Sequence, residues 1–179
     1  VSSISPVAGG LKVSFTAPAS DGGSSVTRYQ VSIDSGVTWK TAALSSVKAS
    51  SFIVGGLSGG TTYGVSMRAF NEAGVSAASD VVNAIYIATP GAPRITSAVV
   101  SGISVKVRYM APTVTGGEAP TMYQYSLDGG VTWRVRPAGT ATEFMLTNLP
   151  KASTLKLSMR AVNSRGYGTA SGILTLKIK

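Results

Sequence analysis

Residues Ser32–Trp39 read SIDSGVTW, and the same pattern returns at Ser126–Trp133 as SLDGGVTW. Both copies fit S-x-D-x-G-x-T-W, and the second begins 126 − 32 = 94 residues after the first. Asp favours turns, where its carboxylate accepts backbone N–H groups. Gly36 and Gly130 can supply the positive φ of a three-residue hairpin loop with a bulge. Each copy is therefore predicted to form a strand, a tight turn and a second strand, with the Trp anchoring the hairpin.

The segments around the doubled stretch also repeat, and they alternate apolar and polar residues as half-buried strands do. Val105–Tyr109 replaces Leu11–Phe15, and Leu157–Asn163 replaces Val65–Asn71. Each repeat contains seven short apolar runs separated by turn signals, with no helical period. Because the repetition covers the whole chain, the sequence predicts two all-β domains. We expect residues 1–89 and 90–179 to be these domains, joined by a short Pro-containing linker around residues 89–93.

The repeats resemble fibronectin type III domains, of the bacterial kind found in large secreted and surface proteins. The resemblance rests on five segments: Val13–Pro18, Tyr29–Val31, Leu57–Gly74, Val107–Pro112 and Leu149–Gly166. It implies two tandem seven-stranded immunoglobulin-like β-sandwiches in an elongated arrangement, and an extracellular or cell-surface location. The doubled stretch itself resembles the Asp-box hairpin that sialidases and other β-propellers carry once per blade. In those proteins the box is structural, so Asp34, Gly36, Trp39, Asp128, Gly130 and Trp133 are expected to have structural roles.

Two departures from the family pattern concern the core. The family places Trp in its second strand, where this chain has Phe15 and Tyr109, so Trp39 and Trp133 are expected to share in filling the core. Tyr63 occupies the position of the family's tyrosine corner, whose hydroxyl bonds to the backbone. The second repeat has Leu155 there, which predicts a greater reliance on apolar packing.

The composition argues against catalysis. The chain has 179 residues with no Cys and no His, which removes the thiolate nucleophile, the usual general base and the commonest metal ligand. The seven acids are scattered: Asp21, Asp34, Glu72, Asp80, Glu118, Asp128 and Glu143. We therefore expect no enzyme activity, no catalytic residue, no metal site and no cofactor. No apolar run approaches the ~20 residues of a membrane span, so no transmembrane segment is expected. The first residue is Val, which we interpret as the start of a fragment of a longer array.

The positive charge is concentrated in the second repeat. The chain has a net charge of +9; residues 1–89 hold five cations and four acids, whereas residues 90–179 hold eleven cations and three acids. Strand alternation, with Trp133 and Val135 pointing inward, would put six cations on one face. These are Arg134, Arg136, Lys156, Arg160, Lys177 and Lys179.

Two interpretations of this basic face remain open. It can be solvated surface, or surface covered by a neighbouring domain of the same polypeptide. Alternatively, it binds an anionic polymer such as an acidic glycan, lipopolysaccharide, teichoic acid or DNA. Sequence-specific nucleic-acid binding is disfavoured because no groove-reading helix is predicted and no aromatic row accompanies the cations. In a nearby loop, Arg165 and Tyr167 are residue types that often anchor partners.

The sequence thus predicts a non-catalytic structural, spacer or adhesion segment of a larger extracellular protein. The alternatives are an anionic-polymer binding module and an accessory module of a secreted polysaccharide hydrolase.

Overall fold

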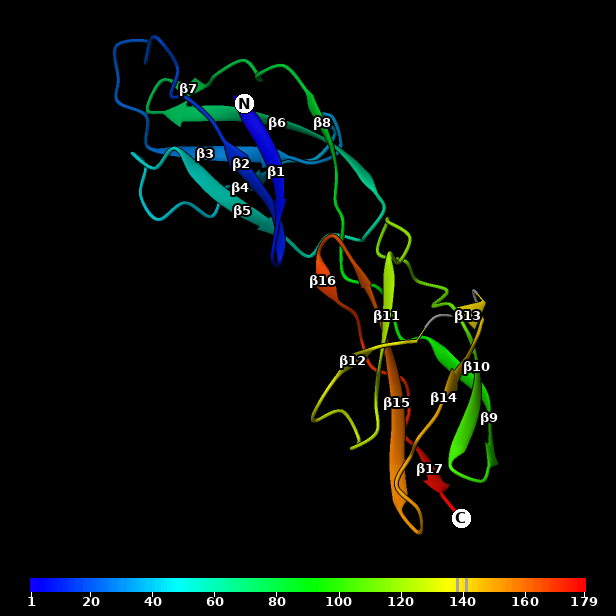
Figure 1. Ribbon diagram of the computed structural model, residues 1–179. Coiled ribbons are helices and arrows are strands. Elements are labelled where there is room, and N and C mark those ends of the chain that lie inside the picture. Colours follow the sequence, from blue (N-terminus) through cyan, green and yellow to red (C-terminus); the bar gives the residue numbers. More distant parts are fainter. Residues whose placement is uncertain (138, 141) are drawn as a thin grey trace. The chain divides into compact units, whose positions relative to one another are not determined.

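The computed structural model describes residues 1–137, 139–140 and 142–179, which form two compact units, Val1–Ile87 and Ala88–Lys179 (Figure 1). Throughout the described residues the only regular secondary structure is the β-strand. This confirms the predicted all-β fold, with two units that each have two sheets.

The first unit has two sheets. One sheet has the order β1-β2-β5, and the other has the order β4-β3-β6-β7, with β8 also pairing with β6. Their bounds are β1 Ser3–Val7, β2 Gly10–Ser14, β3 Arg28–Ser32, β4 Lys40–Thr41, β5 Ser51–Gly55, β6 Thr62–Asn71, β7 Gly74–Val75 and β8 Val82–Ile85. All of these pairings are antiparallel.

The last strand of the first unit is interrupted. β7 pairs with the end of β6 and β8 with its beginning. Between them, the hydroxyls of Ser76 and Ser79 accept the backbone N–H groups of Ala69 and Met67 over 2.9 and 3.0 Å. Serine side chains thus replace ladder bonds where the strand leaves the sheet. When β7 and β8 are counted as one interrupted strand, the first unit has the expected seven strands.

The second unit repeats this topology. Its sheets have the orders β13-β14-β10-β9 and β12-β11-β15-β16, with β17 pairing with β15. The bounds are β9 Arg94–Ser101, β10 Ser104–Met110, β11 Met122–Ser126, β12 Arg134–Val135, β13 Gly139–Thr140, β14 Glu143–Leu146, β15 Thr154–Asn163, β16 Gly166–Tyr167 and β17 Leu174–Lys177. β13 is an additional short edge strand without a described counterpart in the first unit.

Each unit has its own core between its two sheets. In the first, Phe15 packs edge-on against Tyr29, with ring centroids 4.9 Å apart. In the second, Tyr109 is 1% exposed and packs against Tyr123 at the same distance. Neither Trp belongs to these clusters, so the expectation that Trp39 and Trp133 help to fill the core was wrong. Both indoles instead lie over arginines on the outer face of a sheet.

The segment expected to be a linker is built into the second unit. Pro90 and Pro93 are fully buried. The N–H of Gly91 donates to the carbonyl of Val114 over 2.8 Å, and the carbonyl of Pro90 accepts from Thr169. Residues 89–93 are therefore fixed by the second unit's own loops.

Candidate functional site

The doubled stretch forms a loop closed by the same hydrogen bonds in both units. In the first, Ser32 Oγ donates to Asp34 Oδ1 over 2.7 Å and accepts from the N–H of Gly36 over 2.8 Å. Thr38 donates its N–H to Asp34 Oδ1 over 2.8 Å, and its hydroxyl donates to Oδ2. Gly36 has φ +91°, as predicted. The loop spans residues 33–39, which is longer than the predicted three-residue turn.

The second copy has matching bonds. Ser126 Oγ donates to Asp128 Oδ1 over 2.6 Å, and the N–H of Thr132 donates to the same oxygen over 2.9 Å. Gly130 has φ +99°. The N–H of Gly129 donates to the carbonyl of Lys156 over 2.9 Å, which ties the loop to β15. Asp128 and Gly130 therefore shape a loop whose backbone pairs with β15.

Donors directed at the carboxylate hold the pKa of both aspartates low. The hydroxyl and N–H of Thr38, followed by the hydroxyl of Ser32, lower the pKa of Asp34 to about 2. The hydroxyls of Ser126 and Thr132 hold the pKa of Asp128 well below its usual range. Hydrogen bonds to the charged form stabilise that form. Both carboxylates therefore act as fixed acceptors of the loop.

Each loop ends in a Trp that stacks on an arginine. In the first unit, Arg68 Cζ lies 4.3 Å from the ring of Trp39, and Arg68 Nε donates to Gln30 Oε1 over 2.9 Å. The indole Nε1 of Trp39 donates to the carbonyl of Gly36 over 3.0 Å, which fixes the ring. The site therefore consists of a glutamine, an arginine and an indole in fixed mutual positions.

The second unit has the same arrangement, but its second aromatic contact is closer than that of the first, where Arg68 Cζ lies 5.6 Å from the ring of Phe70. Arg160 Cζ lies 4.3 Å from the ring of Trp133 and 3.9 Å from that of Tyr167, and Arg160 Nε donates to Gln124 Oε1 over 2.8 Å. Val75 stands in the first unit where the second has Tyr167. The guanidinium of Arg160 thus contacts two rings at close range.

Sequence reasoning missed the two glutamines. Each lies directly opposite its arginine in the register between two strands, as Gln30↔Arg68 and Gln124↔Arg160. The repeat could have indicated this pair, because the glutamine and the arginine recur at matched positions.

The six predicted cations do not share one face. Arg134 pairs with Tyr125, a core residue, and Val135 pairs with Gln124 on the outer face. Val135 is 60% exposed. The inward orientation expected for Trp133 and Val135 was therefore wrong, and Arg134 lies on the opposite side of the sheet from Arg160. Arg136 also lies toward the core edge, with Cζ 5.9 Å from the ring of Tyr109.

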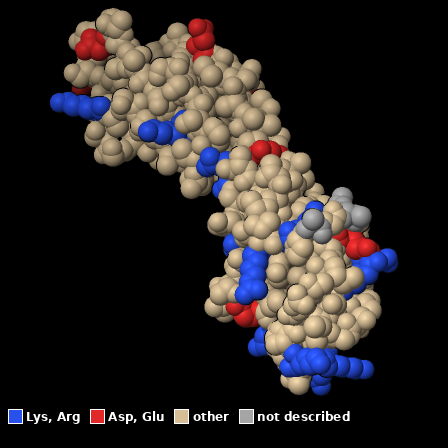
Figure 2. Space-filling model, viewed as in Figure 1, with Lys and Arg blue, Asp and Glu red and all other residues tan. Residues whose placement is uncertain are grey.

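The three remaining lysines lie around β15 and β17. Lys156 pairs with Thr175, and Lys177 pairs with Thr154. A Cβ built on Gly129 would lie 3.5 Å from Lys156 Cδ, so this side chain runs along the doubled loop. Lys179 is exposed at the C-terminus. Lys and Arg side chains gather at the end of the second unit that carries the C-terminus (Figure 2).

Of the two predicted loop contacts, Arg165 lies in the turn between β15 and β16, and Tyr167 lies in β16. The N–H of Arg165 donates to Asn163 Oδ1 over 2.9 Å. Tyr167 is 60% exposed and faces Arg160. The structure therefore brings Tyr167 together with Arg160 and Trp133.

The tyrosine corner is formed in the first unit: Tyr63 Oη accepts the N–H of Ser58 over 2.8 Å. In the second unit, Leu155 packs against the core, and Pro150 stands at the position of Ser58. Proline has no N–H, so the missing hydroxyl leaves no donor without a partner there.

A pocket beside the doubled loop occurs in both units. In the first, a pocket of about 300 Å³ is lined by Tyr63, Asp34 and Lys40 among others. In the second, the matching pocket of about 550 Å³ is lined by Leu155, Asp128 and Arg134. The second pocket thus has Leu155 where the first has Tyr63.

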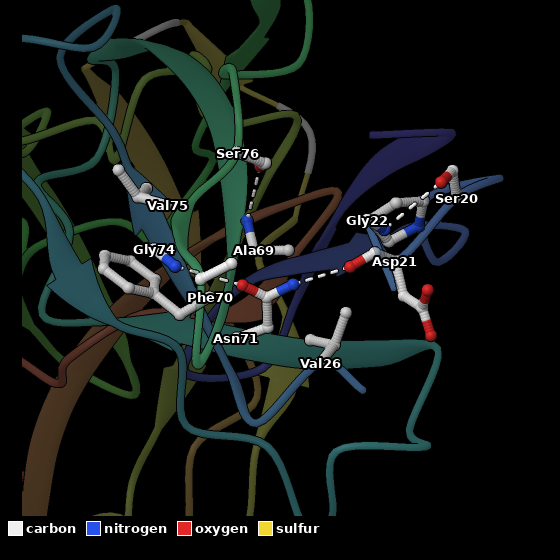
Figure 3. Close-up of a pocket in the computed structure, with 12 residues that line it drawn as sticks. Ser20, Asp21, Gly22, Val26, Ala69, Phe70, Asn71, Gly74, Val75 and Ser76 are labelled. Carbon is white, nitrogen blue, oxygen red and sulfur yellow. Dashed lines mark hydrogen bonds between the residues drawn. The ribbon is translucent and has the colours of Figure 1, made fainter. Parts of the chain in front are cut away.

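A further pocket lies at the loop end of the first unit (Figure 3) and has a volume of about 300 Å³. Asn71 spans it: its amide donates to the carbonyl of Asp21 over 2.6 Å, and its Oδ1 accepts from the N–H of Gly74 over 3.1 Å. Asp21 Oδ1 accepts from the N–H of Gly23. These polar groups form hydrogen bonds with backbone groups, so the pocket is a junction between loops.

Within the described residues, no three His, Cys, Asp or Glu side chains come close enough together to hold a metal ion. In the same part of the chain, no helix has the length and apolar character needed to cross a membrane.

Residues 2–85 match the family model described as Fibronectin type III domain. The mouse cell adhesion molecule DSCAML1 is 30% identical over 157 residues, which cover 84% of this chain and 8% of that protein. The chicken protein of the same name is 28% identical over 160 residues, or 86% of this chain. This chain therefore spans about 8% of the length of these curated relatives.

Among solved structures, the crystal structure of chicken CNTN1 FN1-FN3 domains aligns with a TM-score of 0.46 and 17% identity. The alignment covers 99% of this chain and 65% of that one. The relatives named are animal proteins, and they give no support to the bacterial origin expected from the sequence.

Proposed function

Because residues 2–85 form a fibronectin type III domain and the second unit repeats its fold, we propose that this chain is a non-catalytic adhesion and spacer segment of a larger extracellular protein. Residues 1–89 and 90–179 would be its two domains. One observation carries the proposal: the similarity to cell adhesion molecules extends over 157 residues and so includes both units. A shared tandem pair is a stronger link to that class than one shared domain, since this fold serves many functions.

The structure of each unit fits the proposal. Each has its own core between its own two sheets, as separate domains do. The described polar clusters are engaged in holding loops, as Asp34, Asp128 and Asn71 illustrate.

Replacement of the segment tests this function. In the full-length protein on a cell surface, residues 1–179 are replaced by two unrelated fibronectin type III domains of equal length, and cell adhesion is measured. We expect adhesion to fall, because the replacement keeps the spacing and removes the contact surface. Full adhesion after the replacement would show that the segment acts only as a spacer. Full adhesion after complete deletion would overturn both roles.

Binding of an anionic polymer is a second candidate, supported by the excess of cations in the second unit. The separation of Arg134 from Arg160 onto opposite sides of the sheet weakens it. Retention of the chain on a heparin column that is unchanged by Arg134→Ala with Arg136→Ala would reject the predicted face.

A further inference from the structure

The outer face of the sheet β12-β11-β15-β16 carries a compact group of residues around Arg160. Two rows cross this face: Val135, Gln124 and Arg160 in one, and Met122, Val162 and Tyr167 in the next. The indole of Trp133 covers one part of Arg160. We name the Arg160 patch by the residues that present surface: Met122, Gln124, Trp133, Val135, Arg160 and Tyr167.

The guanidinium of Arg160 is fixed before any partner arrives. Trp133 and Tyr167 contact it through their rings, and Gln124 accepts from its Nε. Stacking on aromatic rings holds the plane of a guanidinium, and a bond at Nε fixes its rotation. The Nη1 and Nη2 end has no hydrogen-bond acceptor among the described residues. That end is the fork that binds a carboxylate through two parallel bonds.

The charge of Arg160 is half-buried and uncompensated. Among the described residues, no acidic group lies within 4.0 Å of it, and both ion pairs in that part of the chain involve Glu143. Two other acids of this unit are already engaged. Asp128 accepts from Thr132, and Glu118 accepts from Ser164. A partially desolvated cation without a counter-charge favours an incoming anion.

The surroundings identify the kind of anion. Val135 and Tyr167 are each 60% exposed, and Met122 is 36% exposed. Exposed aromatic, Met and Arg side chains are the residues that protein interfaces concentrate. Lys156 does not join this patch, because Ser158 separates it from Arg160 along β15 and is covered, at 1% exposure. One fixed cation among apolar side chains suits a single carboxylate flanked by apolar groups better than a hydrated polyanion.

From these observations we propose that the Arg160 patch is a docking surface for a partner protein that presents an Asp or Glu carboxylate beside apolar side chains. The carboxylate binds Nη1 and Nη2 of Arg160, while Met122, Val135 and the ring of Tyr167 contact its apolar neighbours. The inference deepens the proposed adhesion role by naming the contact surface, and it rests on that role only for its biological setting.

A titration of the full 179-residue chain tests the proposal directly. The chain is labelled with ¹⁵N, and the two indole N–H signals, from Trp39 and Trp133, are assigned with Trp→Phe variants. The probe is acetyl-Leu-Glu-Leu-amide, compared with acetyl-Leu-Gln-Leu-amide, which has the same shape without the charge. We expect the Trp133 signal to shift when the Glu peptide is added. The Gln peptide should bind at least about tenfold more weakly, because hydrogen bonds between charged groups are the strong ones.

Matched variants locate the effect. Arg160→Lys keeps the charge but removes the fork and the bond to Gln124, and it should abolish the Trp133 shift. Arg68→Lys makes the same change in the first unit and should leave the Trp133 response unchanged. If Arg160→Lys disturbs the fold, seen in its amide spectrum, Tyr167→Leu retains Arg160 and should reduce the response.

Three results would overturn the proposal: equal responses to the Glu and Gln peptides, no response at Trp133, or a response to a heparin fragment but not to the Glu peptide. None of these results depends on the replacement experiment, which tests the adhesion role without reference to Arg160.

Discussion

The backbone N–H of Ser58 donates to the hydroxyl of Tyr63 over 2.8 Å. In the second unit Pro150 and Leu155 stand at these positions. Donor and acceptor are lost together, so no polar group is left without a partner. The second unit instead packs Leu155 against its core.

The first prediction concerns this pair. Tyr63→Phe should lower the free energy of unfolding of the first unit by about 1 kcal/mol, because the N–H of Ser58 loses its acceptor. Leu155→Tyr should bring no comparable gain, because Pro150 has no N–H to donate. Urea unfolding followed by the fluorescence of Trp39, in a Trp133→Phe background, reports on the first unit. The same measurement in a Trp39→Phe background, with Trp133 retained, reports on the second unit. A gain from Leu155→Tyr equal to the loss from Tyr63→Phe would contradict this explanation.

Acid should weaken the first unit through Asp34. Its pKa in the folded state is about 2, below the ordinary value of 3.8, so the unfolded state binds the proton more tightly. The stabilisation is therefore fully present above about pH 4 and is lost as the pH falls through about 2. Asp34→Asn removes this dependence. The stability difference between wild type and Asp34→Asn, measured by urea unfolding at several pH values, should shrink as the pH falls from 5 to 2. A constant difference over this range would show that the Thr38 bonds do not stabilise the charged form.

The position of Trp39 on the outer face predicts a modest effect of its removal. Trp39→Ala should cost about 1–2 kcal/mol, from the lost arginine contact and the Nε1 hydrogen bond. Phe15→Ala should cost about 3–5 kcal/mol, because it opens a cavity in the core. Thermal unfolding followed by circular dichroism compares the two variants. Equal losses would mean that the indole supports the core after all.

The backbone of the doubled loop requires glycine. Gly130 has φ +99°, a backbone conformation that residues with a side chain rarely adopt. Gly130→Ala should therefore destabilise the second unit by about 1 kcal/mol or more. Gly172→Ala is the matched control, since a Cβ there meets nothing within 4 Å, and it should change stability by less than about 0.5 kcal/mol. Similar losses for both variants, measured by urea unfolding, would argue against strain at Gly130.

The repeat made the fold predictable from sequence. Two copies of one strand pattern constrain each other, so the alternation at Leu11–Phe15 and Val105–Tyr109 identified core residues that are indeed buried. The positive φ of Gly36 and Gly130 also followed from their place in the loop.

The site was less predictable because its contacts cross strands and depend on how one loop folds. Extending the alternation through Trp133 assumed a continuous strand, whereas residues 127–133 form a loop and β12 begins only at Arg134. The break reversed the expected orientation and placed Trp133 over Arg160. The two-ring contact of Arg160 also needs Tyr167, seven residues further along the chain, and no local pattern indicates that pairing.

The most direct test of the account is cell adhesion by the full-length protein carrying Arg160→Lys, measured beside Arg68→Lys and wild type. We expect Arg160→Lys to lower adhesion about tenfold and Arg68→Lys to match wild type. Wild-type adhesion by the Arg160→Lys protein, with both variants displayed equally at the surface, would contradict it.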